Sequence, residues 1–249
     1  MSLPLGRRMA AEAVGTALLV AVVVGSGIQA ERLSSDGGVA LLANSLATVL
    51  GLGVLIALLG PVSGAHFNPV VSLAAWWQER GEPGRPALRE VAVYAGAQIG
   101  GAVAGAALAN AMFELPLVDW SAHTRFAGHL WLAEAVATAG LVLLVLGLTR
   151  TRRSHLSAPA VAAYIGAAYW FTSSTSFANP AVTIGRAFTD TYAGIAPASV
   201  GPFVAAQLVG GIVGVGLVAI LFPAPQAAPG PVARPATAHP VAEPERSRS

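Results

Sequence analysis

The chain has no cysteine, no lysine and little charge of either sign. Of its 249 residues, 10% are charged and 55% are hydrophobic, whereas soluble domains contain about 25% charged residues. The absence of cysteine excludes disulfides, thiol catalysis and thiolate metal sites. This composition is typical of a protein that crosses a membrane several times.

Several function classes lack their motifs. The sequence contains no Gly-rich phosphate loop, no cluster of metal ligands and no plausible nucleophile–base–acid set, so we expect no enzymatic activity, no metal and no other cofactor. The net charge of +2 lies mainly outside the apolar runs, which relates it to membrane orientation and not to nucleic acid binding.

Six long apolar runs predict membrane-spanning helices, at about residues 9–28, 39–59, 88–108, 128–148, 156–171 and 198–222. The first run begins a repeat, so we interpret it as a span and not as a signal peptide. The arginines divide unequally between the two sides of these spans, and the positive-inside rule places both termini in the cytoplasm. One side holds Arg7, Arg8, Arg80, Arg85, Arg89, Arg150, Arg152 and Arg153, and the other holds Arg32, Arg125 and Arg186.

Two further apolar runs are too short to span a membrane. Asn68-Pro69 opens a run that ends near residue 77, and Asn179-Pro180 opens one that ends near residue 188, whereas a spanning helix needs about 20 residues. Asn favours the helix N-cap, and Pro at the first helical position loses no hydrogen bond. The pattern predicts two half-helices that begin at membrane depth, where irregular backbone must be buried in protein or line a wet cavity.

An internal repeat relates the two halves of the chain. Residues 11–17 (AEAVGTA) parallel residues 133–139 (AEAVATA), and residues 94–98 parallel residues 203–207. Three spans in each half is an odd number, so the halves insert in opposite orientations and the half-helices meet near the midplane. We predict a membrane domain over residues 1–222, with inverted repeats at about 5–110 and 125–222, followed by a disordered, Pro/Ala-rich cytoplasmic tail at 223–249.

With Ser63-Gly64-Ala65-His66 before the first Asn-Pro, these motifs resemble the major intrinsic protein (aquaporin) family over about residues 5–222. The resemblance implies an all-α membrane protein of six transmembrane helices and two re-entrant half-helices. It implies a passive channel for water and small neutral solutes, assembled as a homotetramer in the inner (plasma) membrane of a bacterium.

The resemblance also implies the residues of the pore. The paired motifs are Asn68-Pro69-Val70 and Asn179-Pro180-Ala181, and their asparagine amides can donate hydrogen bonds to solute. Helix capping alone would not explain their doubled, inverted arrangement. Backbone carbonyls before each motif would form a ladder of acceptors, at Gly64, Ala65, His66, Thr175, Ser176 and Phe177.

Two acids lie within predicted spans. Glu12 and Glu134 could relay protons in a coupled transporter, since intramembrane acids are often functional. The resemblance instead implies carboxylates that accept backbone donors from the following loop. Gln98 and Gln207 would tie helices to these loops, and His66 would either line the pore or brace its own loop.

The outer filter departs from the family pattern. Many members carry Arg immediately after the second motif, where this chain has Val182. Spacing from the motifs places Thr48, Ala167 and Ser176 at the other filter positions, although a loop two residues shorter would substitute Leu50 for Thr48. These residues predict a small-sided, uncharged filter that admits glycerol-like polyols. The segment 179–186 also resembles a bacterial subgroup associated with arsenic handling, which makes neutral arsenous acid a candidate solute.

Arg186 lies one helical turn beyond Val182. It could supply a displaced positive charge that repels cations, or it could only tie down its loop through Asp190 or nearby carbonyls. Two other functions compete with the channel. A secondary transporter also uses inverted repeats and broken helices, and a purely adhesive or structural membrane protein would show no permeability.

Overall fold

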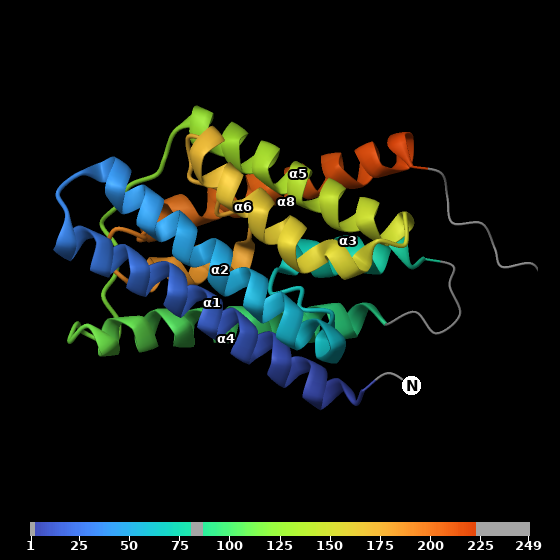
Figure 1. Ribbon diagram of the computed structural model, residues 1–249, viewed down its shortest axis with the longest axis horizontal. Coiled ribbons are helices and arrows are strands. Elements are labelled where there is room, and N and C mark those ends of the chain that lie inside the picture. The colour runs from blue at the N-terminus through green and yellow to red at the C-terminus, as the bar shows by residue number, and fades with distance from the viewer. Residues whose placement is uncertain (1–2, 81–86, 223–249) are drawn as a thin grey trace, which may run out of the picture.

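The computed structural model describes residues 3–80 and 87–222, and within these ranges the chain is helical, with loops between the helices (Figure 1). The predicted tail at 223–249 lies outside the described residues. Six long helices run along the long axis of the molecule, and a short 3-10 helix, η1 (Ser154–Leu156), precedes the fifth of them. The long helices are α1 (Leu5–Leu33), α2 (Gly37–Ser63), α4 (Leu88–Met112), α5 (Gly128–Arg150), α6 (Ser157–Phe171) and α8 (Pro197–Leu221).

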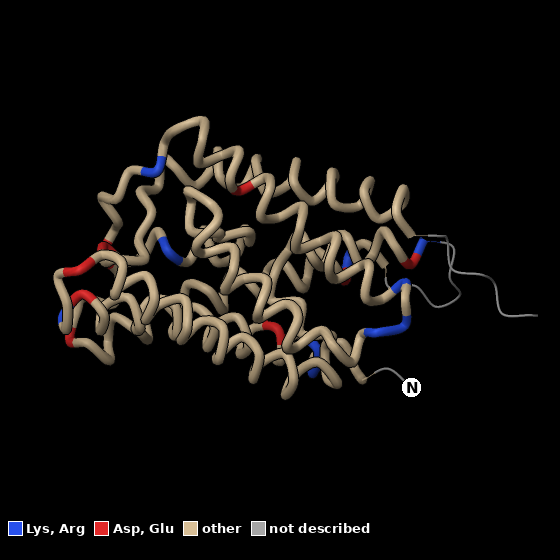
Figure 2. Tube along the Cα trace, turned by 45° about the horizontal axis from the view of Figure 1, so that its top comes forward, with Lys and Arg blue, Asp and Glu red and all other residues tan. Residues whose placement is uncertain are grey.

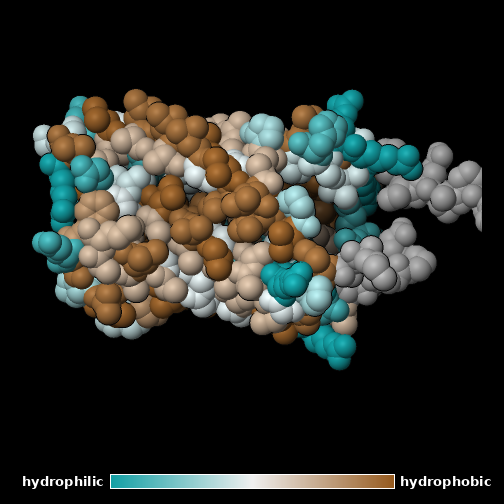
Figure 3. All heavy atoms as spheres, turned by 60° about the horizontal axis from the view of Figure 1, so that its bottom comes forward, coloured by the Kyte–Doolittle hydropathy of each residue, from teal (hydrophilic) through white to brown (hydrophobic). Residues whose placement is uncertain are grey.

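Each predicted span corresponds to one of these helices. Five of them are long and apolar enough to cross a membrane. The exception is α6, whose 15 residues fall short of the roughly 20 that a spanning helix needs. Figure 3 shows hydrophobic side chains gathered around the middle of the molecule and hydrophilic ones at its ends, as a membrane protein requires.

The two ends of the molecule differ in charge. The beginning of α1 and the end of α8 lie at the same end (Figure 1), and Figure 2 shows that most of the described arginines gather there. Acidic residues are more frequent at the opposite end, where the loop between α1 and α2 lies. The asymmetry follows the division of arginines in the sequence.

The two halves repeat the same close helix packing. A Cβ atom on Gly101 of α4 would lie 2.3 Å from the carbonyl oxygen of Ala13 in α1, and one on Gly210 of α8 would lie 2.3 Å from that of Ala135 in α5. Glycine at these positions lets the two backbones approach, which is a common basis of helix association in membranes. The sequence repeat is therefore also a repeat of packing.

Both predicted half-helices form. They are α3 (Pro69–Gln78) and α7 (Pro180–Gly185), and α7 continues as the 3-10 helix η2 (Arg186–Phe188). Asn68 caps α3, with its Oδ1 accepting from the Val70 amide at 3.0 Å, and Asn179 caps α7 by accepting from the Ala181 amide at 3.0 Å. Proline opens each helix, where its missing N–H costs nothing.

Candidate pore

The starts of the two half-helices meet and are bonded to each other. The Nδ2 of Asn68 donates to the carbonyl oxygen of Ala178 at 2.8 Å, and the Nδ2 of Asn179 donates to that of Phe67 at 2.7 Å. Each amide nitrogen carries two hydrogens, so one N–H of each asparagine holds the opposite segment and the other is available to solute.

The backbone before each asparagine is strained. Non-glycine residues with positive φ are uncommon, and such strain persists only when the surroundings hold it in place. Here the left-handed residues occur in both segments that lead to the half-helices. They are Ala65 (φ 49°) and Phe67 (φ 47°) in the first, and Thr175 (φ 62°), Ser176 (φ 50°) and Ala178 (φ 47°) in the second.

A buried carboxylate holds the first segment. Glu12 is fully buried and accepts from the amides of His66 at 3.0 Å and Phe67 at 2.7 Å. The Ser63 hydroxyl donates to it at 2.6 Å, and Gln98 Nε2 donates at 2.7 Å. These four hydrogen bonds satisfy the carboxylate where it lies.

The second half repeats the arrangement. Glu134 is fully buried and accepts from the amides of Phe177 at 2.9 Å and Ala178 at 2.8 Å. Gln207 Nε2 donates to Glu134 at 2.7 Å and to the Thr183 hydroxyl, on α7, at 2.8 Å. In both halves the carboxylate accepts from the strained backbone, and the glutamine ties the carboxylate to a hydroxyl of the half-helix, Ser72 in the first half and Thr183 in the second, as a structural role requires.

One cavity passes both asparagines, and most of the predicted pore residues line it. Of the predicted set, Thr48, Gly64, Ala65, His66, Asn68, Ser176, Phe177, Asn179 and Val182 contribute to its wall. Pro69, Val70, Ala167, Thr175, Pro180 and Ala181 do not.

The sequence left open whether His66 lines the pore or braces its own loop, and its position in the structure fits both roles. Its side chain lines the cavity, and its Nδ1 lies 3.1 Å from the Ser72 hydroxyl in α3. The structure therefore combines a pore-lining position with a brace to the half-helix.

The position of Ala167 differs from that expected from spacing. Ala167 lies on the exposed face of α6, whereas Tyr169 lines the cavity together with Ile165 and Val161. These three residues recur every fourth position, which places them on one helix face. This four-residue spacing in the sequence could have identified the face of α6 that lines the cavity. Counting residues back from the second Asn-Pro motif gave Ala167 instead, because the loop before the motif is irregular.

The exposure of the two side chains decides between Thr48 and Leu50 as the residue of α2 that faces the cavity. Leu50 is 62% exposed, whereas Thr48 is buried and faces the cavity. The hydroxyl oxygens of Thr48 and Tyr169 lie 3.2 Å apart, so a pair of hydroxyls joins α2 and α6 at this level of the pore.

Arg186 also lines the cavity, so a positive charge lies beside the predicted uncharged filter residues. It is only 3% exposed. Its Nε donates to the carbonyl of Ala193. Its guanidinium carbon lies 3.4 Å from the ring centroid of Phe177, a cation–π arrangement that favours the charge.

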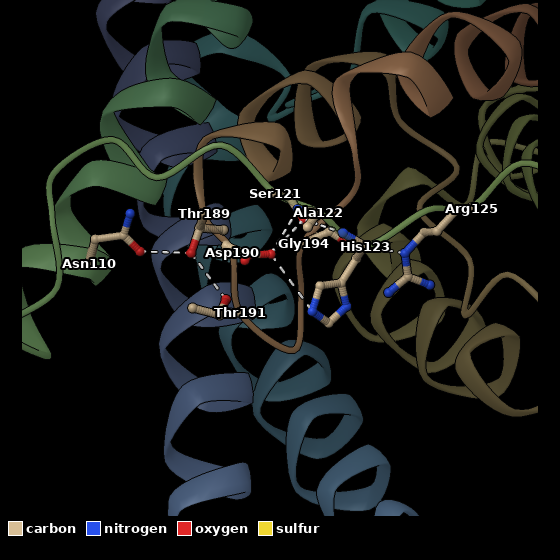
Figure 4. Close-up of polar contacts among 9 residues, drawn as sticks. All are labelled: Asn110, Ser121, Ala122, His123, Arg125, Thr189, Asp190, Thr191 and Gly194. Atoms are coloured by element: carbon tan, nitrogen blue, oxygen red, sulfur yellow. Dashed lines mark hydrogen bonds and ion pairs between the residues drawn. The ribbon is translucent and has the colours of Figure 1, made fainter.

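Arg186 does not pair with Asp190, contrary to one of the expectations from the sequence. Asp190 accepts from the Ala122 amide at 2.8 Å and lies 3.8 Å from His123 Nε2, as Figure 4 shows. The loop instead holds Arg186 through a backbone carbonyl, which was the other possibility.

Comparison with known proteins agrees with this geometry. The sequence profile described as major intrinsic protein matches residues 1–176. An aquaglyceroporin of Rhizobium meliloti (strain 1021), AqpS, is 50% identical over 208 residues, covering 84% of this chain and 87% of the relative. The rat protein aquaporin-2 is 33% identical over 166 residues, covering 64% of this chain and 58% of the relative.

A solved structure shares the fold. The X-ray structure of the aquaglyceroporin from Plasmodium falciparum superposes with a TM-score of 0.64 at 19% identity, covering 86% of this chain and 96% of that chain. The helices, the paired half-helices and the cavity thus define a membrane channel of the aquaporin fold. The chain belongs to the major intrinsic protein family.

Proposed function

We propose that this protein is a passive channel for water and small neutral solutes, including glycerol-like polyols. The cavity that runs past both asparagines carries the proposal, because it brings hydrogen-bond donors and acceptors to an otherwise apolar passage. The relative from Rhizobium meliloti is named an aquaglyceroporin, which supports polyols as solutes.

The wall of the cavity suits neutral hydroxylic molecules. Asn68 and Asn179 each keep an amide N–H for solute, and carbonyls of the strained segments offer acceptors. Leu19, Val23 and Leu52 contribute apolar surface to the same cavity. A molecule that can exchange its water shell for these few polar contacts passes more readily than an ion, which would lose hydration without compensation.

The arrangement of the acids favours a channel over a proton-coupled transporter. Glu12 and Glu134 are fully buried, hydrogen-bonded to the backbone and outside the residues that line the cavity. A proton relay needs acids that reach the passage. We therefore assign both carboxylates a structural role.

Val182 favours a wider constriction than an arginine would at the same position. A valine is smaller and donates no hydrogen bond, so the site admits solutes larger than water. Arsenous acid, a neutral molecule with three hydroxyl groups, fits the same chemistry as glycerol and belongs in the same test.

The proposal includes the setting of the channel. We infer an inner (plasma) membrane of a bacterium, with both termini in the cytoplasm and four copies in a homotetramer. The concentration of arginines at the end that holds the N-terminus supports the orientation (Figure 2). The tetramer and the membrane rest on family resemblance.

Stopped-flow light scattering on proteoliposomes tests the function with water, glycerol and arsenous acid. We expect permeability well above that of empty liposomes, insensitive to proton and sodium gradients and not saturating at low millimolar solute. A saturable, gradient-dependent flux would favour the secondary transporter, and no flux would favour a structural protein.

A matched pair of variants ties the flux to the cavity. Thr48→Trp places a bulky side chain in the cavity and should abolish glycerol flux, whereas Leu50→Trp changes the exposed face of the same helix and should not. Equal flux in both variants would contradict the assignment of this cavity as the pore.

A further inference from the structure

Two guanidinium groups at the outer end of the pore have no carboxylate partner. Among residues 3–80 and 87–222, the ion pairs join Arg8 to Glu90 and His123 to Asp190. The Nε of Arg186 donates a hydrogen bond to the carbonyl of Ala193. The Nε of Arg125 donates to the next carbonyl, that of Gly194, at 3.0 Å. Backbone carbonyls orient both groups but contribute no negative charge.

Both guanidinium groups converge on one aromatic ring. The guanidinium carbon of Arg186 lies 3.4 Å from the ring centroid of Phe177, and that of Arg125 lies 5.2 Å from the same centroid. The two carbons can be no further apart than these two distances combined. Like charges at this range repel, and the ring face offsets only part of that cost.

The nearest acid of the loop does not compensate them. Asp190 is turned toward residues 121–123, where it accepts from the Ala122 amide and the Ser121 hydroxyl (Figure 4). The two guanidinium groups that meet at Phe177 therefore have no salt-bridge partner among the described residues. Burial lowers the pKa of Arg125 from its ordinary value, but arginine starts so high that the group stays charged at neutral pH.

A buried hydroxyl in the same cavity also lacks a partner. Ser176 is 4% exposed, its Oγ makes no hydrogen bond in the described residues, and it lines the cavity with Arg186. Buried hydroxyl groups are nearly always hydrogen-bonded. Tyr169 brings a second hydroxyl to the cavity. An unpaired donor and an uncompensated guanidinium on one cavity are the groups that an oxyanion would satisfy.

We propose that Arg186, with Ser176 and the adjacent charge of Arg125, forms an anion-binding site at the outer end of the pore, and that a bound oxyanion obstructs the passage of neutral solutes. The planar fork of a guanidinium matches the oxygens of phosphate or carboxylate groups. Among the described residues that line the cavity, Arg186 is the only arginine or lysine, so the full positive charge that would bind the anion is fixed at one place. The site therefore holds the anion and does not conduct it.

Thermal unfolding of the purified protein tests binding without reference to transport. Inorganic phosphate is the probe, compared with chloride at equal ionic strength. We expect phosphate to raise the melting temperature of the wild type by a few degrees, as a ligand that binds only the folded state does. The shift should disappear in Arg186→Gln and shrink in Arg125→Gln.

Arg32→Gln is the matched control. Arg32 lies at the same end of the molecule, donates to the carbonyl of Phe113 at 2.8 Å and stacks 5.0 Å from the Phe113 ring centroid, but it does not line the cavity. This variant should keep the full phosphate shift. A shift of the same size in Arg186→Gln and Arg125→Gln, or its loss in Arg32→Gln, would overturn the site.

Glycerol uptake by spheroplasts that express the channel tests the obstruction, because the outer mouth then faces the medium. External phosphate should slow uptake through the wild type and Arg32→Gln at least twofold, and should leave uptake through Arg186→Gln unchanged. Equal slowing in all three would show an effect unrelated to the site. If the wild type conducts no glycerol, the proposed function fails, and the unfolding experiment still decides whether phosphate binds.

Discussion

The positive charge of this pore lies one helical turn away from the position where many family members carry it. Val182 and Arg186 both line the cavity, and their spacing of four residues puts them on one face. The guanidinium of Arg186 is drawn aside onto Phe177 and the carbonyl of Ala193. The cavity thus keeps a cation while the valine leaves space beside it.

Val182→Arg should shift selectivity toward water. A second guanidinium would narrow the constriction, and we expect glycerol flux to fall about tenfold, equivalent to about 1.4 kcal/mol of added barrier, with a smaller loss of water flux. Stopped-flow measurements of both solutes give the ratio. Val182→Leu adds one carbon without charge and should change the ratio much less, and equal losses of water and glycerol flux in Val182→Arg would contradict the prediction.

Replacing either buried carboxylate should destabilise the protein without changing the energetics of transport. Glu12→Gln keeps the shape but turns an acceptor into a donor that faces the amides of His66 and Phe67. Each lost hydrogen bond to a charged group costs about 1.5–3 kcal/mol, so the melting temperature should fall clearly, and Glu134→Gln should behave alike. A variant of normal stability that had lost a proton-dependent flux would instead support a proton relay.

At the scale of the helices, the spans and half-helices could be predicted from the sequence, but the face that α6 turns toward the pore could not. Apolar run length and the Asn-Pro caps depend on neighbouring residues, which a sequence displays directly. The face of α6 that lines the pore depends on the backbone path of residues 172–178, which connect α6 to α7. Three of these residues have positive φ, namely Thr175, Ser176 and Ala178. Because the loop is irregular, the number of residues in it does not predict which residues of α6 face the pore.

Two adjacent glycines of α4 offer a test of the helix packing. Gly101→Ala would place a Cβ 2.3 Å from the carbonyl oxygen of Ala13, whereas Gly100→Ala meets nothing within 4 Å. We expect Gly101→Ala to destabilise by about 1–3 kcal/mol, as overpacking does. Gly100→Ala should be neutral or slightly stabilising because alanine favours helix. Thermal unfolding of both variants measures the difference, and equal melting temperatures would contradict the close approach.

At the scale of the whole molecule, the sequence indicated the inverted symmetry but not the cluster at the outer mouth. Glu12 and Glu134, each followed by an Asn-Pro and a Gln, could be recognised as a repeat. Phe177, Arg125 and Arg186 come from two distant segments, and no periodicity links them. Their convergence depends on where the external loops fold over the pore.

The absence of cysteine makes the orientation of the whole molecule directly measurable, because any cysteine that is introduced is the sole thiol. Ser35 lies in the loop between α1 and α2, and His155 lies in η1 between α5 and α6, and both residues are exposed. These loops are separated by an odd number of spans, so they lie on opposite sides of the membrane. On the proposed orientation, which rests on the excess of arginines beside His155, that side faces the cytoplasm.

Ser35→Cys should therefore react with a membrane-impermeant maleimide in intact cells, and His155→Cys should react only after the membrane is permeabilised. Labelling each variant after the cells are permeabilised controls for the intrinsic reactivity of its cysteine. The reverse pattern would place the termini outside the cytoplasm. It would also turn Arg186 and the proposed anion site toward the cell interior, because α7 and the loop after it lie on the side opposite to His155. The labelling result thus decides from which side an anion could obstruct the pore.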